Sequence, residues 1–89
     1  MRKPTGYIVM EFCDDYEQAL RLKHDAQTPP LGVLDWGTPA ALFATRADAR
    51  AAIARTEHFS KAFGVPQNGA PGSMPAKKDC RITPVAFAR

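Results

Sequence analysis

The chain has 89 residues, of which 45% are hydrophobic and 24% are charged, and its formal net charge is +3. A chain of this length forms one domain, here 1–89, with a thin core of two layers, and its composition is globular rather than disordered. The mild positive charge permits binding to nucleic acid or to an acidic protein and requires neither.

No apolar run approaches the roughly 18 residues of a membrane-spanning helix. The basic start at 1–3 could open a signal peptide, but the apolar stretch Tyr7–Met10 that follows stops at Glu11, too early for the hydrophobic part of such a signal. We therefore expect a cytoplasmic protein. In that setting Cys13 and Cys80 are expected to be reduced thiols, although both flank predicted strands and a bond between them stays open.

The first predicted element is a strand over residues 7–12, which are rich in β-forming side chains. Successive side chains of a strand point to opposite faces. Ile8, Met10 and Phe12 make a purely apolar set, so we expect this set to face the core. Tyr7, Val9 and Glu11 make a mixed set, which is expected to face solvent or a partner.

A helix is predicted over residues 15–26. Asp14 and Asp15 are both good N-caps, and a Glu or Gln follows at the spacing of a capping box. The side chains that share one helical face are Tyr16, Ala19, Leu20, Lys23 and Ala26. The helix must end before Thr28-Pro29-Pro30, because proline cannot continue it.

Two strands are predicted next, over residues 31–36 and 40–44. The short turn Gly37-Thr38-Pro39 between them indicates an antiparallel hairpin. Trp36 lies at its tip. It either closes the end of the core or, if exposed, anchors an interface, since tryptophan is frequent in binding hot spots.

The second predicted helix covers residues 46–63. Thr45 is its expected N-cap, with Asp48 in the first turn, where the helix dipole favours negative charge. One face carries Ala49, Ala52, Ile53, Thr56, Phe59 and Phe63. Gly64 supplies the left-handed residue that ends a helix, and Pro66 prevents continuation.

The segment 64–79 is predicted to be a flexible loop rich in proline and glycine, because neither a helical nor a strand period survives there. Residues 80–87 are apolar and extended enough for a last strand. Pro84 cannot donate a ladder hydrogen bond, which confines that strand to a sheet edge or a bulge.

In chain order these elements predict an α+β fold of the ferredoxin-like type, β-α-β-β-α-β, with two helices on one face of an antiparallel sheet. That topology places the second and fourth strands at the edges, where Gly32 and Pro84 disturb the hydrogen bonding of the sheet least. The alternative is a smaller β-β-α-β fold in which residues 13–30 do not form a full helix.

Two resemblances accompany this topology. The pattern Leu42-Phe43-x-Thr45-Arg46-x-x-Ala49-Arg50-x-x-Ile53 resembles a strand-to-helix segment of small bacterial and phage proteins, which implies a phage or mobile-element setting and no particular activity. The predicted order also resembles that of the RNA recognition motif, which stacks bases on aromatic side chains of its central strands. The third strand here lacks the basic-Gly-aromatic pattern of that module.

The sequence offers no constellation for catalysis or for a cofactor. Cys13, His24, His58 and Cys80 lack the spacing of metal ligands. His24 and Asp25 point about 100° apart on a helix and do not form a dyad. Capping explains the paired Asp14 and Asp15, and no phosphate-binding glycine motif is present. The sequence therefore predicts a non-enzymatic protein with no metal and no cofactor.

Two functions remain. The first is an interaction module that binds a protein partner or forms a homodimer, such as a phage or mobile-element accessory or inhibitor protein, with Tyr7, Val9 and Trp36 as partner-binding residues. The alternative is weak binding of single-stranded nucleic acid by the sheet face and a basic strip on the second helix. The residues of that strip are Arg46, Arg50 and Lys61, and Lys77 and Lys78 would strengthen it if they fold over beside the helix.

Overall fold

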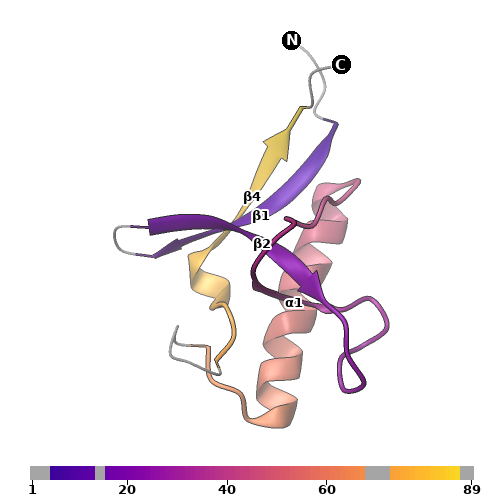
Figure 1. The fold of residues 1–89 in the computed structure, drawn as a ribbon, viewed down its shortest axis with the longest axis vertical. Coiled ribbons are helices and arrows are strands. Elements are labelled where there is room, and N and C mark those ends of the chain that lie inside the picture. The colour runs from indigo at the N-terminus through magenta and orange to yellow at the C-terminus, as the bar shows by residue number, and fades with distance from the viewer. Residues whose placement is uncertain (1–4, 14–15, 68–72, 87–89) are drawn as a thin grey trace.

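The structure is a computed structural model that describes residues 5–13, 16–67 and 73–86. Its elements follow in the order β-β-β-α-β, with a short 3-10 helix before the last strand. Their bounds are β1 Gly6–Cys13, β2 Tyr16–Lys23, β3 Val33–Trp36, α1 Arg46–Phe63, η1 Lys77–Asp79 and β4 Cys80–Val85. The strands form one antiparallel sheet in the order β3-β2-β1-β4, and α1 packs on one face of it (Figure 1).

The ferredoxin-like prediction is wrong, because residues 16–26, the described part of the predicted helix 15–26, do not form a helix. Residues 16–23 form β2, which pairs with β1 in a register from Cys13↔Tyr16 to Met10↔Ala19. The second half of β2 pairs with β3, so this strand satisfies backbone groups of two neighbours, which a helix could not do. The β-β-α-β alternative also has one strand too few before the helix. The predicted resemblance to the RNA recognition motif rested on the two-helix order, so it is lost with that order.

Leucine spacing explains why a strand forms here. Leu20 lies opposite Trp36 and Leu22 opposite Leu34, so the two leucines lie on one face of the strand at a period of two. Leu20 is completely buried. The capping role predicted for Asp14 and Asp15 falls on residues outside the described part of the chain.

The predicted strand 40–44 and its hairpin with 31–36 are also wrong. Strand β1 pairs with β2 only over residues 10–13. Toward the N-terminus of β1 the two strands diverge, and residues 41–43 lie between them. Ala41 N–H donates to the Leu20 carbonyl at 3.0 Å, while Tyr7 and Phe43 exchange hydrogen bonds of 2.8 and 2.7 Å. Only the Tyr7↔Phe43 bridge is strand-like. This segment takes the place of a neighbouring strand beside the first half of β1.

The two faces of β1 are the reverse of those predicted. Val9 belongs to the core cluster, Tyr7 packs against it, and Glu11 is buried. Met10 lies on the opposite face together with Ile8 and Phe12, and none of the three belongs to the core. The core itself is formed by Val9, Leu20, Leu34, Phe43, Ala49 and Ala52.

Helix α1 confirms the predicted helix and its caps. Thr45 Oγ1 accepts from Asp48 N–H at 3.1 Å, and Gly64 at φ 66° donates back to the Ser60 carbonyl. The buried face begins as predicted with Ala49, Ala52 and Thr56, but it ends on Ser60, whereas Phe63 is exposed. The capping residues therefore predicted the ends of the helix correctly. Which residues of its last turn are buried depends on tertiary packing, which the helical period alone did not predict.

Strand β4 confirms the predicted edge position for Pro84. Its partner Tyr7 directs its own N–H and carbonyl toward Phe43, away from β4. Tyr7 and Pro84 are therefore a non-hydrogen-bonded pair, and the missing N–H of Pro84 costs no bond to β1. The described ends of the chain lie side by side, since Thr5 N–H donates to the Val85 carbonyl at 2.8 Å.

In the predicted loop 64–79, residues 73–76 are buried and residues 77–79 form η1. Met74 N–H donates to the Pro66 carbonyl, and Gln67 Nε2 donates to the Pro75 carbonyl. The C-terminal part of the segment is thereby attached to its beginning and lies beside the C-terminal half of α1 (Figure 1).

Candidate functional site

A buried carboxylate organises the helix-covered face of the sheet. Glu11 on β1 is only 2% exposed, and its Oε1 accepts three hydrogen bonds. The donors are Trp36 Nε1 at 2.6 Å, Tyr16 OH at 3.0 Å and Gln18 Nε2 at 3.4 Å. They come from β2 and β3, so a single carboxylate oxygen joins three strands. Hydrogen bonds from these neutral donors offset part of the cost of burying the carboxylate.

Tyr16 shows the electrostatic effect of this carboxylate. Its hydrogen bond to Glu11 is the largest of the effects that raise the pKa of Tyr16 to about 12. Ionisation would remove the donated proton and place a second negative charge beside Glu11. The phenol therefore remains a donor throughout the neutral range.

Sequence reasoning missed this cluster because it placed residues 15–26 in a helix. The cluster depends on the pairing of β1 with β2, in which Glu11 lies opposite Gln18 and Cys13 opposite Tyr16. This register brings the acceptor and two of its donors together on adjacent strands.

The three predicted partner-binding residues do not form a common exposed surface. Val9 is completely buried, so the prediction that it faces outward is wrong. Tyr7 is half-buried on the same face, and the Arg46 guanidinium lies 4.9 Å from the centre of its ring. Trp36 is half-buried and held by Glu11.

The open face of the sheet carries an apolar row instead. Ile8, Met10 and Phe12 alternate with the buried residues of β1, and Phe12 is 41% exposed. Ala19 lies opposite Met10 on β2, while Arg81 lies opposite Met10 on β4 and Glu17 opposite Phe12. An apolar centre with charged neighbours is the usual composition of a protein-binding surface. The paired ends of β1 and β2, at Cys13 and Tyr16, also project away from α1 (Figure 1).

Two of the predicted basic residues come together. Arg50 on α1 and Lys77 on η1 line one hollow of about 280 Å³, whose wall also includes Cys80. Lys77 Nζ lies 3.9 Å from Glu57 Oε1, so it does lie beside the helix. Arg46 is held over Tyr7, and neither Lys61 nor Lys78 lines this hollow.

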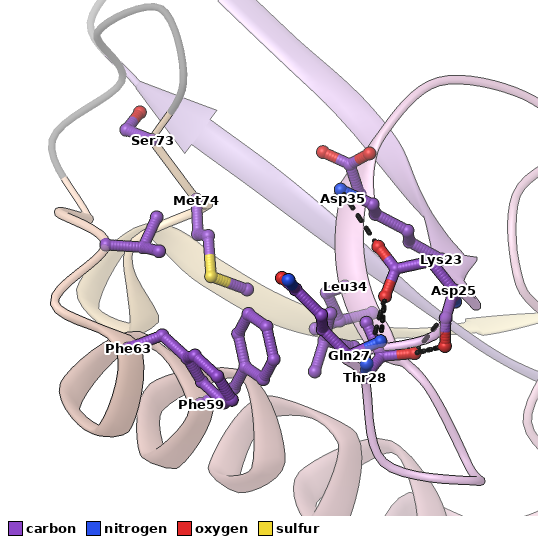
Figure 2. A pocket seen from close by; sticks show the side chains of 12 residues that line it. Lys23, Asp25, Gln27, Thr28, Leu34, Asp35, Phe59, Phe63, Ser73 and Met74 are labelled. Carbon is purple, nitrogen blue, oxygen red and sulfur yellow. Dashed lines mark hydrogen bonds and ion pairs between the residues drawn. The ribbon is translucent and has the colours of Figure 1, made fainter.

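A second hollow, of about 270 Å³, lies between the C-terminal half of α1 and the 25–28 turn (Figure 2). Phe59, Phe63 and Met74 line its apolar side. The opposite rim is polar, but Asp25 is already engaged by the N–H groups of residues 27 and 28 and by Lys23. The first of these bonds is the largest cause that lowers the pKa of Asp25.

Ser73 also lines this second hollow, and its buried Oγ has no hydrogen-bond partner among the described residues. With Asp25 already engaged, the orphaned hydroxyl leaves the hollow few polar groups with which to select a ligand. We therefore assign it no binding role.

The cysteines are free thiols in the structure. Cys80 lies opposite Glu11 and two positions from Cys13 along the ladder, which is a diagonal offset rather than a facing pair. Burial, followed by the nearby Glu11 carboxylate, raises the pKa of the Cys80 thiol to about 11. Cys80 Sγ donates to the Ala76 carbonyl at 3.3 Å. A thiol held protonated in this way is a poor nucleophile at neutral pH.

In the part of the chain that the structure describes, no three His, Cys, Asp or Glu side chains cluster as metal ligands would. Within the same residues, no helix has the length and apolar character needed to cross a membrane. No protein-family model, no curated protein and no solved structure matches the chain.

Proposed function

We propose that this protein is a non-enzymatic interaction module that binds a protein partner on the open face of its sheet. The observation that supports it is the apolar row Ile8, Met10 and Phe12 on the face that α1 does not cover. Apolar side chains left in contact with water on a regular, rigid surface are typical of interaction sites. The flanking Glu17 and Arg81 supply a polar rim.

The edges of the sheet favour binding by the face rather than by strand addition. On β4, Pro84 removes an outward N–H from the free edge. On β3, Leu34 N–H is already bound by Thr56 Oγ1 of α1 at 2.8 Å. At each edge of the sheet, a partner strand would lack one of the backbone N–H donors that it needs. The open face is therefore the better binding surface.

Site-specific photo-cross-linking in cells tests this proposal. A photoreactive amino acid replaces Phe12, and the matched control carries it at His58, which is exposed on α1. We expect one discrete protein adduct from position 12, none from position 58, and loss of the adduct when Met10→Asp is added. Equal adducts from both positions, or an adduct that Met10→Asp leaves unchanged, would overturn the proposal.

Binding of single-stranded nucleic acid is the second candidate, and the hollow shared by Arg50 and Lys77 favours it. Phosphate contacts are salt-dependent because they release counterions. We expect Arg50→Glu and Lys77→Glu each to weaken oligonucleotide binding at low salt, whereas Lys23→Glu, the same charge change outside the hollow, leaves it unchanged. Binding that none of these changes affects would remove this candidate.

The cellular setting is part of the same proposal. Two free thiols are compatible with a reducing compartment, which supports a cytoplasmic location. The resemblance of the segment from Leu42 to Ile53 supports a phage or mobile-element setting, in which the interaction module would be an accessory or inhibitor protein.

A further inference from the structure

An apolar groove lies on the side of the molecule formed by α1, β2 and the segments that precede β3 and α1. Its volume is about 370 Å³. Leu31 and Leu42 line it and are 66% and 51% exposed, which makes them two of the most exposed large apolar side chains described. The other lining residues are Leu22, Phe43, Ala44, Asp48, Ala51 and Arg55.

Both leucines are held in their exposed positions by the fold. Arg55 on α1 donates to the Leu31 carbonyl at 3.3 Å and to the Gly32 carbonyl at 3.0 Å, which ties the loop to the helix. Leu42 is flanked by Ala41 and Phe43, whose N–H groups bind β2 and β1. Its side chain also fills the space that a Cβ on Gly6 would occupy. The groove is therefore a preformed surface and needs no rearrangement to bind.

The charges on the groove have opposite signs at its two ends. Asp48 and Arg55 are seven residues apart on α1, which is about 10 Å along the helix axis. With Ala51 they lie within about 60° of each other around the helix, at 100° per residue. Among the described residues the Asp48 carboxylate has no basic partner, and Arg55 has no acidic one.

We propose that the occupant of this groove is a second copy of the chain, related by a two-fold axis that passes near Ala51. A two-fold interface places one patch against itself, so residue i meets residue j and j meets i. Two antiparallel α1 helices then bring Asp48 of each copy to Arg55 of the other. The small Ala51 side chains meet at the axis and let the helices approach closely.

The same axis matches the apolar residues. Leu42 lies at the Asp48 end of the groove, just before the start of α1, and Leu31 is tied to Arg55 at the other end. Leu42 of one copy therefore meets Leu31 of the other. A purely apolar partner would bury Asp48 and Arg55 without counter-charges, which is costly. This dimer goes beyond the proposed function, because it uses a different face of the molecule.

Charge reversal tests the two-fold arrangement. In Asp48→Lys alone, a lysine meets Arg55 twice, and in Arg55→Glu alone, a glutamate meets Asp48 twice. We expect each variant alone to dissociate at least tenfold more readily than the unaltered dimer in sedimentation velocity. When the two variants are mixed, each contact has opposite charges, so we expect a heterodimer that neither variant forms alone.

The apolar contact has its own matched control. We expect Leu42→Asp to abolish the dimer, whereas Phe63→Asp, at a side chain of similar exposure outside the groove, leaves it intact. Circular dichroism checks that each variant is folded. A strictly monomeric unaltered chain, or a mixture of the two charge variants that stays monomeric while both are folded, overturns the proposal. Cross-linking at Phe12 is read independently and distinguishes this failure from failure of the proposed function.

Discussion

On β1 the face that contains a charged residue is buried, whereas the purely apolar face is open. The face covered by α1 contains the buried carboxylate of Glu11, whereas the open face carries Ile8, Met10 and Phe12. The covered face is polar at one point because three donors from neighbouring strands converge there. On this strand, partners across the sheet decide which side is buried, rather than the mean polarity of each face.

The largest expected effect is at Glu11. Replacing Glu11 by alanine leaves Trp36 Nε1 without an acceptor beside a cavity, so we expect a loss of about 3 kcal/mol in the free energy of unfolding. Urea denaturation measures it. The matched change on the open face is Met10→Ala, for which about 1 kcal/mol is expected. Equal losses at the two positions would break the contrast between the faces.

Thr56 is a second buried polar contact on the covered side. Its hydroxyl accepts from Leu34 N–H at 2.8 Å and donates to the Ala52 carbonyl at 2.7 Å, which joins α1 to β3. Thr56→Val keeps the shape but leaves that buried N–H unsatisfied, at an expected cost of about 2 kcal/mol. Thr56→Ser keeps the hydroxyl and is expected to retain most of the stability. Equal unfolding midpoints for the valine and serine variants would show that the bond is not important.

On the open face, a substitution is expected to affect binding without affecting folding. Phe12→Thr keeps a residue that favours strands and removes exposed apolar surface. We expect the free energy of unfolding to change by less than about 0.5 kcal/mol. Thermal melting measures this, and a large loss would place Phe12 in the core rather than on a binding surface.

The smallest effect concerns pH. Because the folded-state pKa of Tyr16 is raised to about 12, above the value near 10 of an unfolded chain, the stability from its hydrogen bond is complete below about pH 10. It is lost as the pH rises from about 10 to 12. Tyrosinate absorbance follows the ionisation, and Tyr16→Phe identifies its share of the signal. In Glu11→Gln the transition is expected to move toward pH 10, and an unmoved transition would contradict the assigned cause.

Elements with local signals were predictable from the sequence. The caps at Thr45 and Gly64 set the bounds of α1 without reference to the rest of the chain. The missing N–H of Pro84 correctly indicated a sheet edge. Each of these rests on the chemistry of one residue or of neighbours along the chain.

Elements decided by distant pairing were not predictable in this way. The stretch 16–23 has a plausible helical face as well as the two-residue period of Leu20 and Leu22, and its pairing with both β1 and β3 decides between them. Errors in the site followed from that choice. Once β2 is taken as a helix, Glu11 loses its donors Tyr16 and Gln18, and the apolar face of β1 becomes the expected core.

The central claim, that Glu11 lies inside and binds Trp36, is tested most directly by the indole N–H signal in proton NMR. The chain has one tryptophan, so the signal is unambiguous. We predict an indole proton that exchanges slowly with water in the unaltered protein and in Met10→Ala, and rapidly in Glu11→Ala. An indole proton that exchanges freely in the unaltered protein, or that Glu11→Ala leaves protected, would contradict the account.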